Sequence, residues 1–202
     1  MPNFRIVVTQ ACDAGTWLDT WSAEYDKSSG NDETEYTKLI ELSARTTDTE
    51  GFYERIGRWK DSANSDRRWQ PNVASVAYPI WQVAEQVRPT CPVPEQVIPF
   101  LENWSSKRYE DTFQNRTVTK RFGLSRATTL LHFLSRGRLP IYDSNVIEAM
   151  HLLYESNPVY TAVYYWNVFY PQFQALACEC GTEDYRKLDK ALFSYGAAKL
   201  SD

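Results

Sequence analysis

Apolar residues recur at helical spacing along most of the chain. Trp17, Trp21 and Tyr25 stand four residues apart, which is the spacing of one face of a short amphipathic helix. The same kind of periodicity predicts further helices along the rest of the sequence. The expected helices cover residues 16–25, 33–46, 49–60, 72–87, 95–105, 114–122, 125–135, 144–156, 159–177 and 182–199.

The pattern therefore predicts a mainly α protein with a short extended segment near its N-terminus, at residues 4–9. A length of 202 residues suits a single helical domain with a core of its own. We divide it into an N-terminal helical part (1–106), a central segment (107–150) and C-terminal helices (151–202). The aromatic run from Tyr160 to Tyr170 is typical of a helix in the core.

The amino-acid composition excludes several classes of protein. Hydrophobic residues make up 43% of the chain and aromatic residues 14%, which excludes a disordered or collagen-like protein. No apolar run has the length of a membrane span, and the first residues are too short and too weakly basic for a signal peptide. We expect a cytoplasmic protein without a membrane partner.

Cysteine and histidine are too few and too scattered for a metal centre. The four cysteines include one close pair, Cys178 and Cys180, and the other two are isolated. The only histidines are His132 and His151. We expect reduced cysteines, no bound metal and no organic cofactor.

Charge is distributed unevenly, although the formal net charge is only −4. Ten acidic and three basic residues lie between Asp13 and Glu50, whereas eight basic and two acidic residues lie between Lys107 and Arg138. A basic stretch of this kind is typical either of a solvated surface or of a segment that follows a phosphate backbone. The sequence that accompanies it favours the second interpretation.

That sequence runs from Gly123 to Val146 and has three parts. A glycine turn, Gly123-Leu-Ser125, is expected to join two short helices. An apolar helix follows, and a short loop then brings Pro140 and Asp143 to the start of the next helix. Basic residues surround the turn, at Lys120, Arg121 and Arg126.

This arrangement resembles the helix-hairpin-helix DNA glycosylases, and within them the 8-oxoguanine glycosylase-like branch. The resemblance covers roughly residues 115–150 together with the C-terminal stretch 187–196. It implies a helix-hairpin-helix glycosylase-like fold in which Asp143 is the catalytic residue and the turn binds a DNA phosphate. The phosphate contacts would then come from Lys120, Arg121, Gly123, Ser125 and Arg126.

Two departures from the family pattern refine the expected activity. Ser125 stands where the family turn has its second glycine, and its Cβ would make a positive φ costly. Arg126 and Ala127 stand near the place where bifunctional members carry a Schiff-base lysine, and arginine is not a nucleophile. We therefore expect removal of the base without strand cleavage. The iron–sulfur members of the family have four closely spaced C-terminal cysteines, which Cys178 and Cys180 cannot supply, so we expect no cluster.

The chemistry assigned to Asp143 is the hydrolysis of an N-glycosidic bond. A carboxylate stabilises the positive charge that develops on the sugar and orients the attacking water. The target base must first leave the DNA stack and enter an aromatic or apolar pocket. We expect this pocket to be lined by Trp59, His132, Phe133 and Tyr142, with Trp69, Trp81 and Trp104 as further candidates.

Each of these features also has a simpler interpretation. Asp143 would cap a helix in any protein, the basic residues would suit a solvated surface, and His132 fits the core or a pocket edge better than a catalytic role. A second hypothesis is thus a catalytically inactive protein of the same fold that binds nucleic acid, a nucleotide or a protein. A third is a structural protein whose acidic N-terminal region contacts a basic partner.

Overall fold

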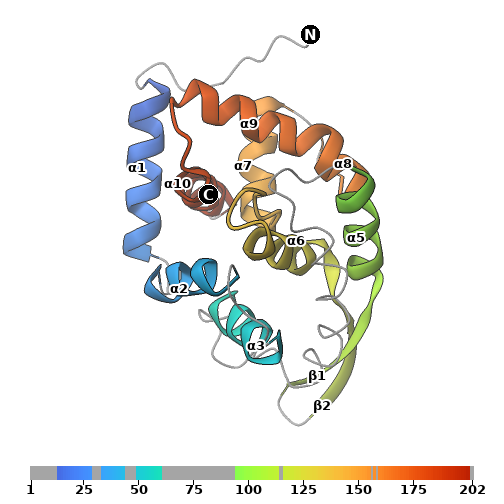
Figure 1. The fold of residues 1–202 in the computed structure, drawn as a ribbon. Coiled ribbons are helices and arrows are strands. Elements are labelled where there is room, and N and C mark those ends of the chain that lie inside the picture. Colours follow the sequence, from blue (N-terminus) through green and yellow to red (C-terminus); the bar gives the residue numbers. More distant parts are fainter. Residues whose placement is uncertain are drawn as a thin grey trace. The chain divides into compact units, whose positions relative to one another are not determined.

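The structure is a computed structural model, and it describes residues 13–28, 33–43, 49–60, 94–113, 116–155, 157 and 159–200. The expected extended segment at 4–9, the expected helix at 72–87, Trp69 and Trp81 lie outside these residues. Figure 1 shows that the described chain is mainly helical, which confirms the predicted class. No described helix is both long enough and apolar enough to cross a membrane.

The elements follow one another as helices interrupted by one β-hairpin. Before and within the hairpin they are α1 (Ala14–Ser28), α2 (Glu33–Ser43), α3 (Thr49–Lys60), α5 (Pro94–Ser106), β1 (Arg108–Phe113) and β2 (Arg116–Arg121). After it come α6 (Gly123–Leu134), α7 (Ser144–Tyr154), α8 (Ala162–Tyr164), the π-helix η1 (Tyr165–Phe169), α9 (Tyr170–Glu179) and α10 (Tyr185–Leu200).

The β-hairpin corrects the prediction of a helix over residues 114–122. β1 and β2 pair as antiparallel strands, and residues 116–121 form the second strand. This strand contains the run Thr117-Val-Thr119, whose β-branched side chains favour extended backbone over helix. The turn at Gly123 consequently joins a strand to a helix, and the expectation of two helices around it is wrong.

The chain divides into two compact units. Unit 1 comprises residues 1–29 and 140–202, and unit 2 comprises residues 30–139. The prediction of one domain over the whole chain stays a prediction.

In unit 1, α10 packs against both α1 and α7. Trp17 and Trp21 of α1 meet Tyr195 of α10 edge to face, with ring centroids 5.7 and 5.3 Å apart. Gly196 lies against the start of α7 so closely that a Cβ there would overlap the carbonyl oxygen of Asn145. This close approach holds α10 directly against the first residues of α7.

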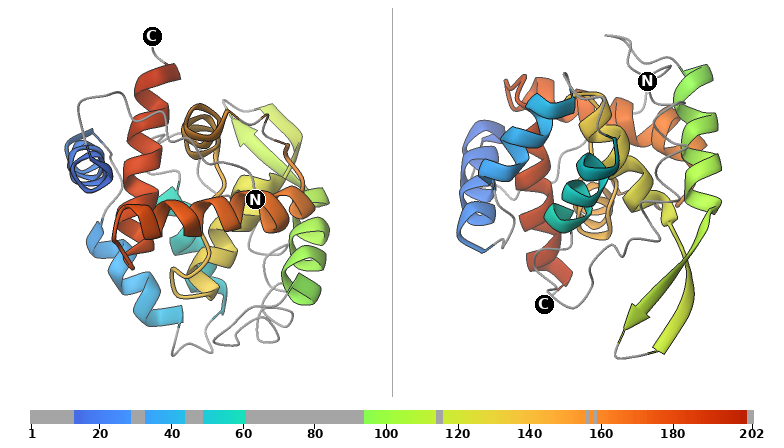
Figure 2. Two further views of the ribbon diagram at one scale, coloured as in Figure 1. Left: turned by 90° about the horizontal axis from the view of Figure 1, so that it is seen from above. Right: turned by 60° about the horizontal axis from the view of Figure 1, so that its bottom comes forward.

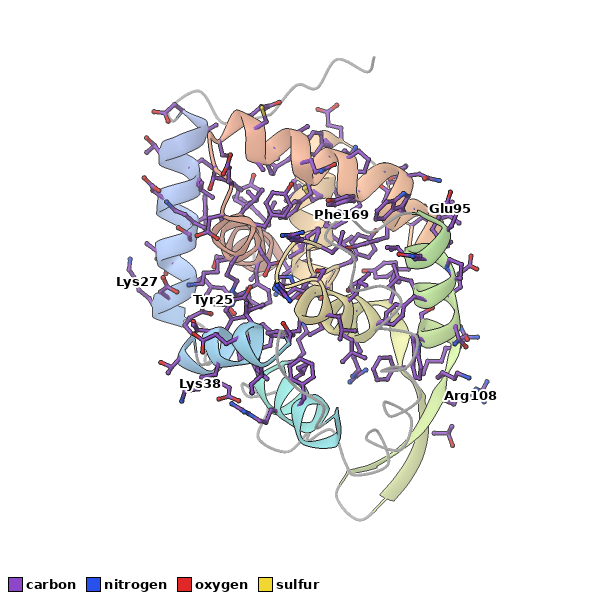
Figure 3. The ribbon with its side chains drawn as sticks, in the orientation of Figure 1. Tyr25, Lys27, Lys38, Glu95, Arg108 and Phe169 are labelled. Carbon is purple, nitrogen blue, oxygen red and sulfur yellow. The ribbon has the colours of Figure 1, made fainter. Side chains whose placement is uncertain are left out.

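In unit 2, α6 is the central helix, because α2, α3 and α5 all pack against it. The side chains of Arg55 and Glu35 join α3 to α2 through two hydrogen bonds of 2.6 and 3.0 Å. Figure 2 shows the β-hairpin extending away from α5 and α6, the two helices that flank it in sequence. Unit 2 therefore combines a packed helical core with a two-stranded ribbon.

Candidate functional site

The loop that leads to Asp143 is held in place by buried tyrosines of unit 1. The hydroxyl of Tyr165, a fully buried residue, donates a hydrogen bond of 2.9 Å to the carbonyl oxygen of Pro140. The hydroxyl of Tyr142 donates one of 3.2 Å to the carbonyl oxygen of Val159. Both ends of the short segment between Pro140 and Asp143 are thus tied to the chain around residues 159–165.

Asp143 is the N-cap of α7, as the sequence predicted. Its backbone is extended (φ −107°, ψ 175°), and its Oδ1 accepts a hydrogen bond of 3.1 Å from the backbone N–H of Val146. Its own carbonyl oxygen accepts the first helical bond, from Ile147. Only 8% of the residue is exposed. The cap fixes the carboxylate with one oxygen directed at the start of the helix.

The side chain of Tyr160 lies near the carboxylate. Burial raises the pKa of Tyr160, and the charges of Asp143 and then Glu148 raise it further, which places this phenol near both acids. The ring of Tyr160 lies 6.0 Å from that of Tyr142 between centroids, and the ring of Tyr164 lies 6.5 Å from that of Tyr142. Asp143 therefore lies close to an aromatic group.

Tyr160 differs from its neighbours because it is largely exposed. Its exposed fraction is 62%, whereas that of Tyr142 is 1%. Val159 and Val163 are also about half exposed, so an apolar surface lies beside the capped helix start. Thr161 begins α8 by accepting a hydrogen bond from the N–H of Tyr164, which leaves Tyr160 before the helix. The prediction that this end of the aromatic run lies in the core is wrong.

A small hollow in unit 1 adjoins Tyr142. It is partly open to solvent and has no room for a water-sized molecule, so it is a crevice between side chains rather than a ligand pocket. Side chains from α7 and from the helical run 162–179 line it together with Tyr142. They are Ile147, Met150, His151, Tyr164, Phe169 and Gln172.

The other residues expected in a base pocket lie in the core of unit 2. Trp59 and Phe133 are 3% and 0% exposed, and their rings meet edge to face at 5.1 Å. His132 is fully buried; its Nδ1 lies 2.7 Å from the carbonyl oxygen of Leu139 and its Nε2 lies 2.8 Å from the hydroxyl of Tyr36. Since a carbonyl only accepts, Nδ1 donates, and in the neutral ring Nε2 accepts from the tyrosine. Trp104 is likewise buried, on α5.

The residues expected to bind phosphate gather where β2 leads into α6. Gly123 has a φ of +79°, and a Cβ added there would meet open space. Ser125 lies in the first turn of α6 and does not have a positive φ. The conformational energy cost expected from its Cβ therefore does not arise. Arg126 donates a weak hydrogen bond of 3.4 Å to the carbonyl oxygen of Phe122, and Arg121 is exposed. The backbone of Lys120 is paired in β2.

Sequence reasoning missed two features of these regions. It assigned Tyr160 to the core, although a threonine followed by a helical run signals a helix start at Thr161. It also counted Arg108 only as part of the basic stretch and did not include it among the phosphate-binding residues, although Arg108 stands opposite Arg121 in the hairpin. The predicted residues are thus divided between the units: Asp143 and Tyr142 belong to unit 1, and the others belong to unit 2.

Neither a protein-family model, nor a curated protein, nor a solved structure matches this chain. Within the described residues, no three His, Cys, Asp or Glu side chains gather into a group that would hold a metal ion. The features that point to a function are Asp143, its aromatic neighbour Tyr160 and the basic hairpin.

Proposed function

We propose that the protein is a monofunctional DNA glycosylase that removes a modified or damaged base with Asp143. The observation that carries the proposal is the capped, largely buried carboxylate of Asp143 beside the exposed ring of Tyr160. The sequence resemblance to the 8-oxoguanine branch of the helix-hairpin-helix glycosylases supports it. The enzyme would act in the cytoplasm, in base-excision repair or in defence against foreign DNA.

In this mechanism Asp143 acts on the sugar of a nucleotide that has left the duplex. Its carboxylate stabilises the positive charge that develops at C1′ as the bond to the base breaks. It also orients a water for attack at C1′ and accepts a proton from it. The hydrogen bond from Val146 and the tyrosine-anchored loop fix the carboxylate in advance, so little reorganisation accompanies the reaction.

Tyr160 would provide the surface on which the extruded base stacks. An exposed phenol ring next to the carboxylate has the chemistry for this, since stacking of a base on an aromatic ring contributes about 1–3 kcal/mol. Val159 and Val163 extend the same apolar surface. No lysine nucleophile is part of this proposal, so the product is an intact strand with an abasic site.

The test is the formation of abasic sites in DNA by the wild-type protein and by Asp143→Asn. Labelled duplex and single-stranded DNA with a panel of modified bases would be incubated with each and then treated with hot alkali. We expect alkali-dependent breaks with the wild type and a loss of about 100-fold or more in Asp143→Asn. Asparagine is also a good N-cap, so the variant should keep its helix and its thermal stability.

A matched control is Asp184→Asn, which removes an exposed capping carboxylate from the start of α10 in the same unit. This variant should keep full activity. Breaks that appear without alkali would contradict the monofunctional assignment. Equal activity of the wild type and Asp143→Asn would rule out Asp143 as the catalytic residue.

A second candidate is a catalytically inactive protein of this fold that binds DNA. The hollow beside Tyr142 favours it, because a crevice without room for a water-sized molecule does not accommodate an extruded nucleotide. It predicts DNA binding with no abasic sites on any substrate of the panel. The same assay therefore separates the two candidates.

A further inference from the structure

The base of the β-hairpin brings two arginines directly opposite each other. In the register of the two strands, Arg108 of β1 faces Arg121 of β2, and both side chains are exposed. Directly opposed residues of an antiparallel pair share one face of the ribbon, with Cβ atoms roughly 5 Å apart. The backbone N–H of Phe122 donates to the carbonyl oxygen of Lys107 (2.8 Å) and closes the hairpin just beyond this pair.

This pairing is unfavourable for the fold by itself. Like charges directly opposite each other on a ribbon destabilise it. Within the residues that the structure describes, neither Arg108 nor Arg121 forms a salt bridge, whereas Arg55 of the same unit is bound through two nitrogens to Glu35. The pair thus presents two positive charges to the solvent.

The neighbouring residues extend the positive charge. Lys107, the residue before Arg108, is exposed, and its Nζ lies 5.9 Å from the ring centroid of Trp104. In sequence, β2 begins with Arg116 and ends with Lys120 and Arg121. The ribbon from Lys107 to Arg121 therefore has five basic and two acidic residues, in a protein whose net charge is −4.

We propose that the Arg108–Arg121 pair binds the phosphate backbone of duplex DNA, so that the β-hairpin is a DNA-binding arm. A guanidinium donates two parallel hydrogen bonds to a phosphate, and two guanidinium groups on one face are close enough to hold one phosphate or its neighbour. A two-stranded ribbon also has a width that a DNA groove accepts. This inference rests on the proposed function in one respect: it takes DNA, rather than another polyanion, as the ligand of the arginine pair.

The test is the binding of a fluorescein-labelled, unmodified duplex, measured by anisotropy over a range of salt concentrations. The variants are Arg108→Gln/Arg121→Gln and, as a charge-matched control, Lys27→Gln/Lys38→Gln, which removes two exposed lysines from α1 and α2. Each is made in the wild type and in Asp143→Asn. We expect roughly tenfold weaker binding for the arginine variant and a salt-dependence slope smaller by about 2. The control should bind like its parent.

Thermal unfolding separates a binding role from a structural one. Removing two opposed positive charges should leave the melting temperature unchanged or slightly raise it. A structural pair would instead lower it on replacement. Arg108→Lys/Arg121→Lys keeps both charges and should retain most of the salt dependence while losing part of the affinity.

The outcomes distinguish this inference from the proposed function. Loss of binding in the arginine variant, with no abasic sites formed by any protein, would leave the inference standing and overturn the glycosylase. Full binding by the arginine variant, or an equal loss in the lysine control, would overturn the inference even where abasic sites form. Absence of duplex binding by the wild type would overturn the inference, and the assay for abasic sites would still decide the proposed function.

Discussion

Around Asp143 the polar groups of unit 1 find partners within the protein, whereas at the base of the hairpin two charges of unit 2 face each other. The Asp143 carboxylate is capped by Val146, and its loop is anchored by Tyr165 through Pro140. Arg108 and Arg121 instead share a face with no salt bridge among the described residues. The first arrangement suits a group that must be preorganised, and the second suits a group whose partner arrives from solution.

The largest effect is expected from disrupting the contact between α10 and α7, the helix that Asp143 caps. Gly196→Ala puts a Cβ into the carbonyl oxygen of Asn145, so the backbone of α10 or α7 must shift. We expect a loss of about 3 kcal/mol in the free energy of unfolding, measured with urea, together with reduced formation of abasic sites.

A matched glycine in the same unit provides the control. Gly15→Ala in α1 meets only the side-chain oxygen of Asp13, at 3.3 Å, and alanine favours the helix. We expect it to change the free energy of unfolding by less than about 1 kcal/mol and to leave activity intact. A loss as large as that of Gly196→Ala would show that the close approach of α10 to α7 is not the cause.

A smaller effect should follow from loosening the loop alone. Tyr165→Phe removes the hydrogen bond to Pro140 and leaves that carbonyl without the hydroxyl donor. We expect a loss of about 1–2 kcal/mol in the free energy of unfolding and a lower rate of base removal, because Asp143 is held less firmly. Substrate binding should change less than the rate.

The corresponding change in unit 2 should affect stability only. Tyr36→Phe removes the hydroxyl that donates to Nε2 of His132, and we expect a loss of similar size, about 1–2 kcal/mol. Because His132 belongs to the core, the rate of base removal by the folded protein should not change. If Tyr36→Phe slows the reaction as much as Tyr165→Phe, the contrast between the two regions fails.

The smallest effect concerns alkaline pH. Burial raises the pKa of Cys180 from 9.0 to about 11, and burial also raises the pKa of Tyr142 and of Tyr165. A raised pKa means that the folded protein keeps these protons after the unfolded chain has lost them. Stability is therefore fully present below pH 9 and declines above it, first through Cys180 and then through the tyrosines.

Melting temperatures between pH 8 and 11 would measure this decline. Cys180→Ala should reduce the decline in melting temperature between pH 9 and 11. Cys178→Ala, at an exposed position, should leave the decline unchanged. If Cys180→Ala does not change the decline in melting temperature between pH 9 and 11, the Cys180 thiol is not its cause.

Local signals in the sequence were sufficient to predict where α7 begins. Asp143 follows a proline-containing loop and precedes a helical run, and its cap needs only the N–H of Val146, three residues away. The two strands were missed for the opposite reason. Six residues are too few for periodicity to separate strand from helix, and β2 is a strand because β1 pairs with it.

The aromatic residues show the same limit. The run of tyrosines and phenylalanines predicted a central helix, and Tyr165 and Phe169 are indeed buried, within a π-helical turn. Their composition did not reveal that Tyr160 would precede α8 and face solvent. Likewise His132, Phe133 and Trp59 had the composition of a base pocket, yet their rings pack with Tyr36 in the core of unit 2.

What the sequence determined by itself is the mainly α class, the cap at Asp143 and the concentration of basic residues between Lys107 and Arg138. Each depends on composition or on contacts within about four residues. Only the tertiary structure decided that Arg108 faces Arg121, that Tyr165 anchors Pro140 and that Gly196 meets Asn145. These contacts join residues distant in sequence, and they form only where packing and strand register bring the segments together.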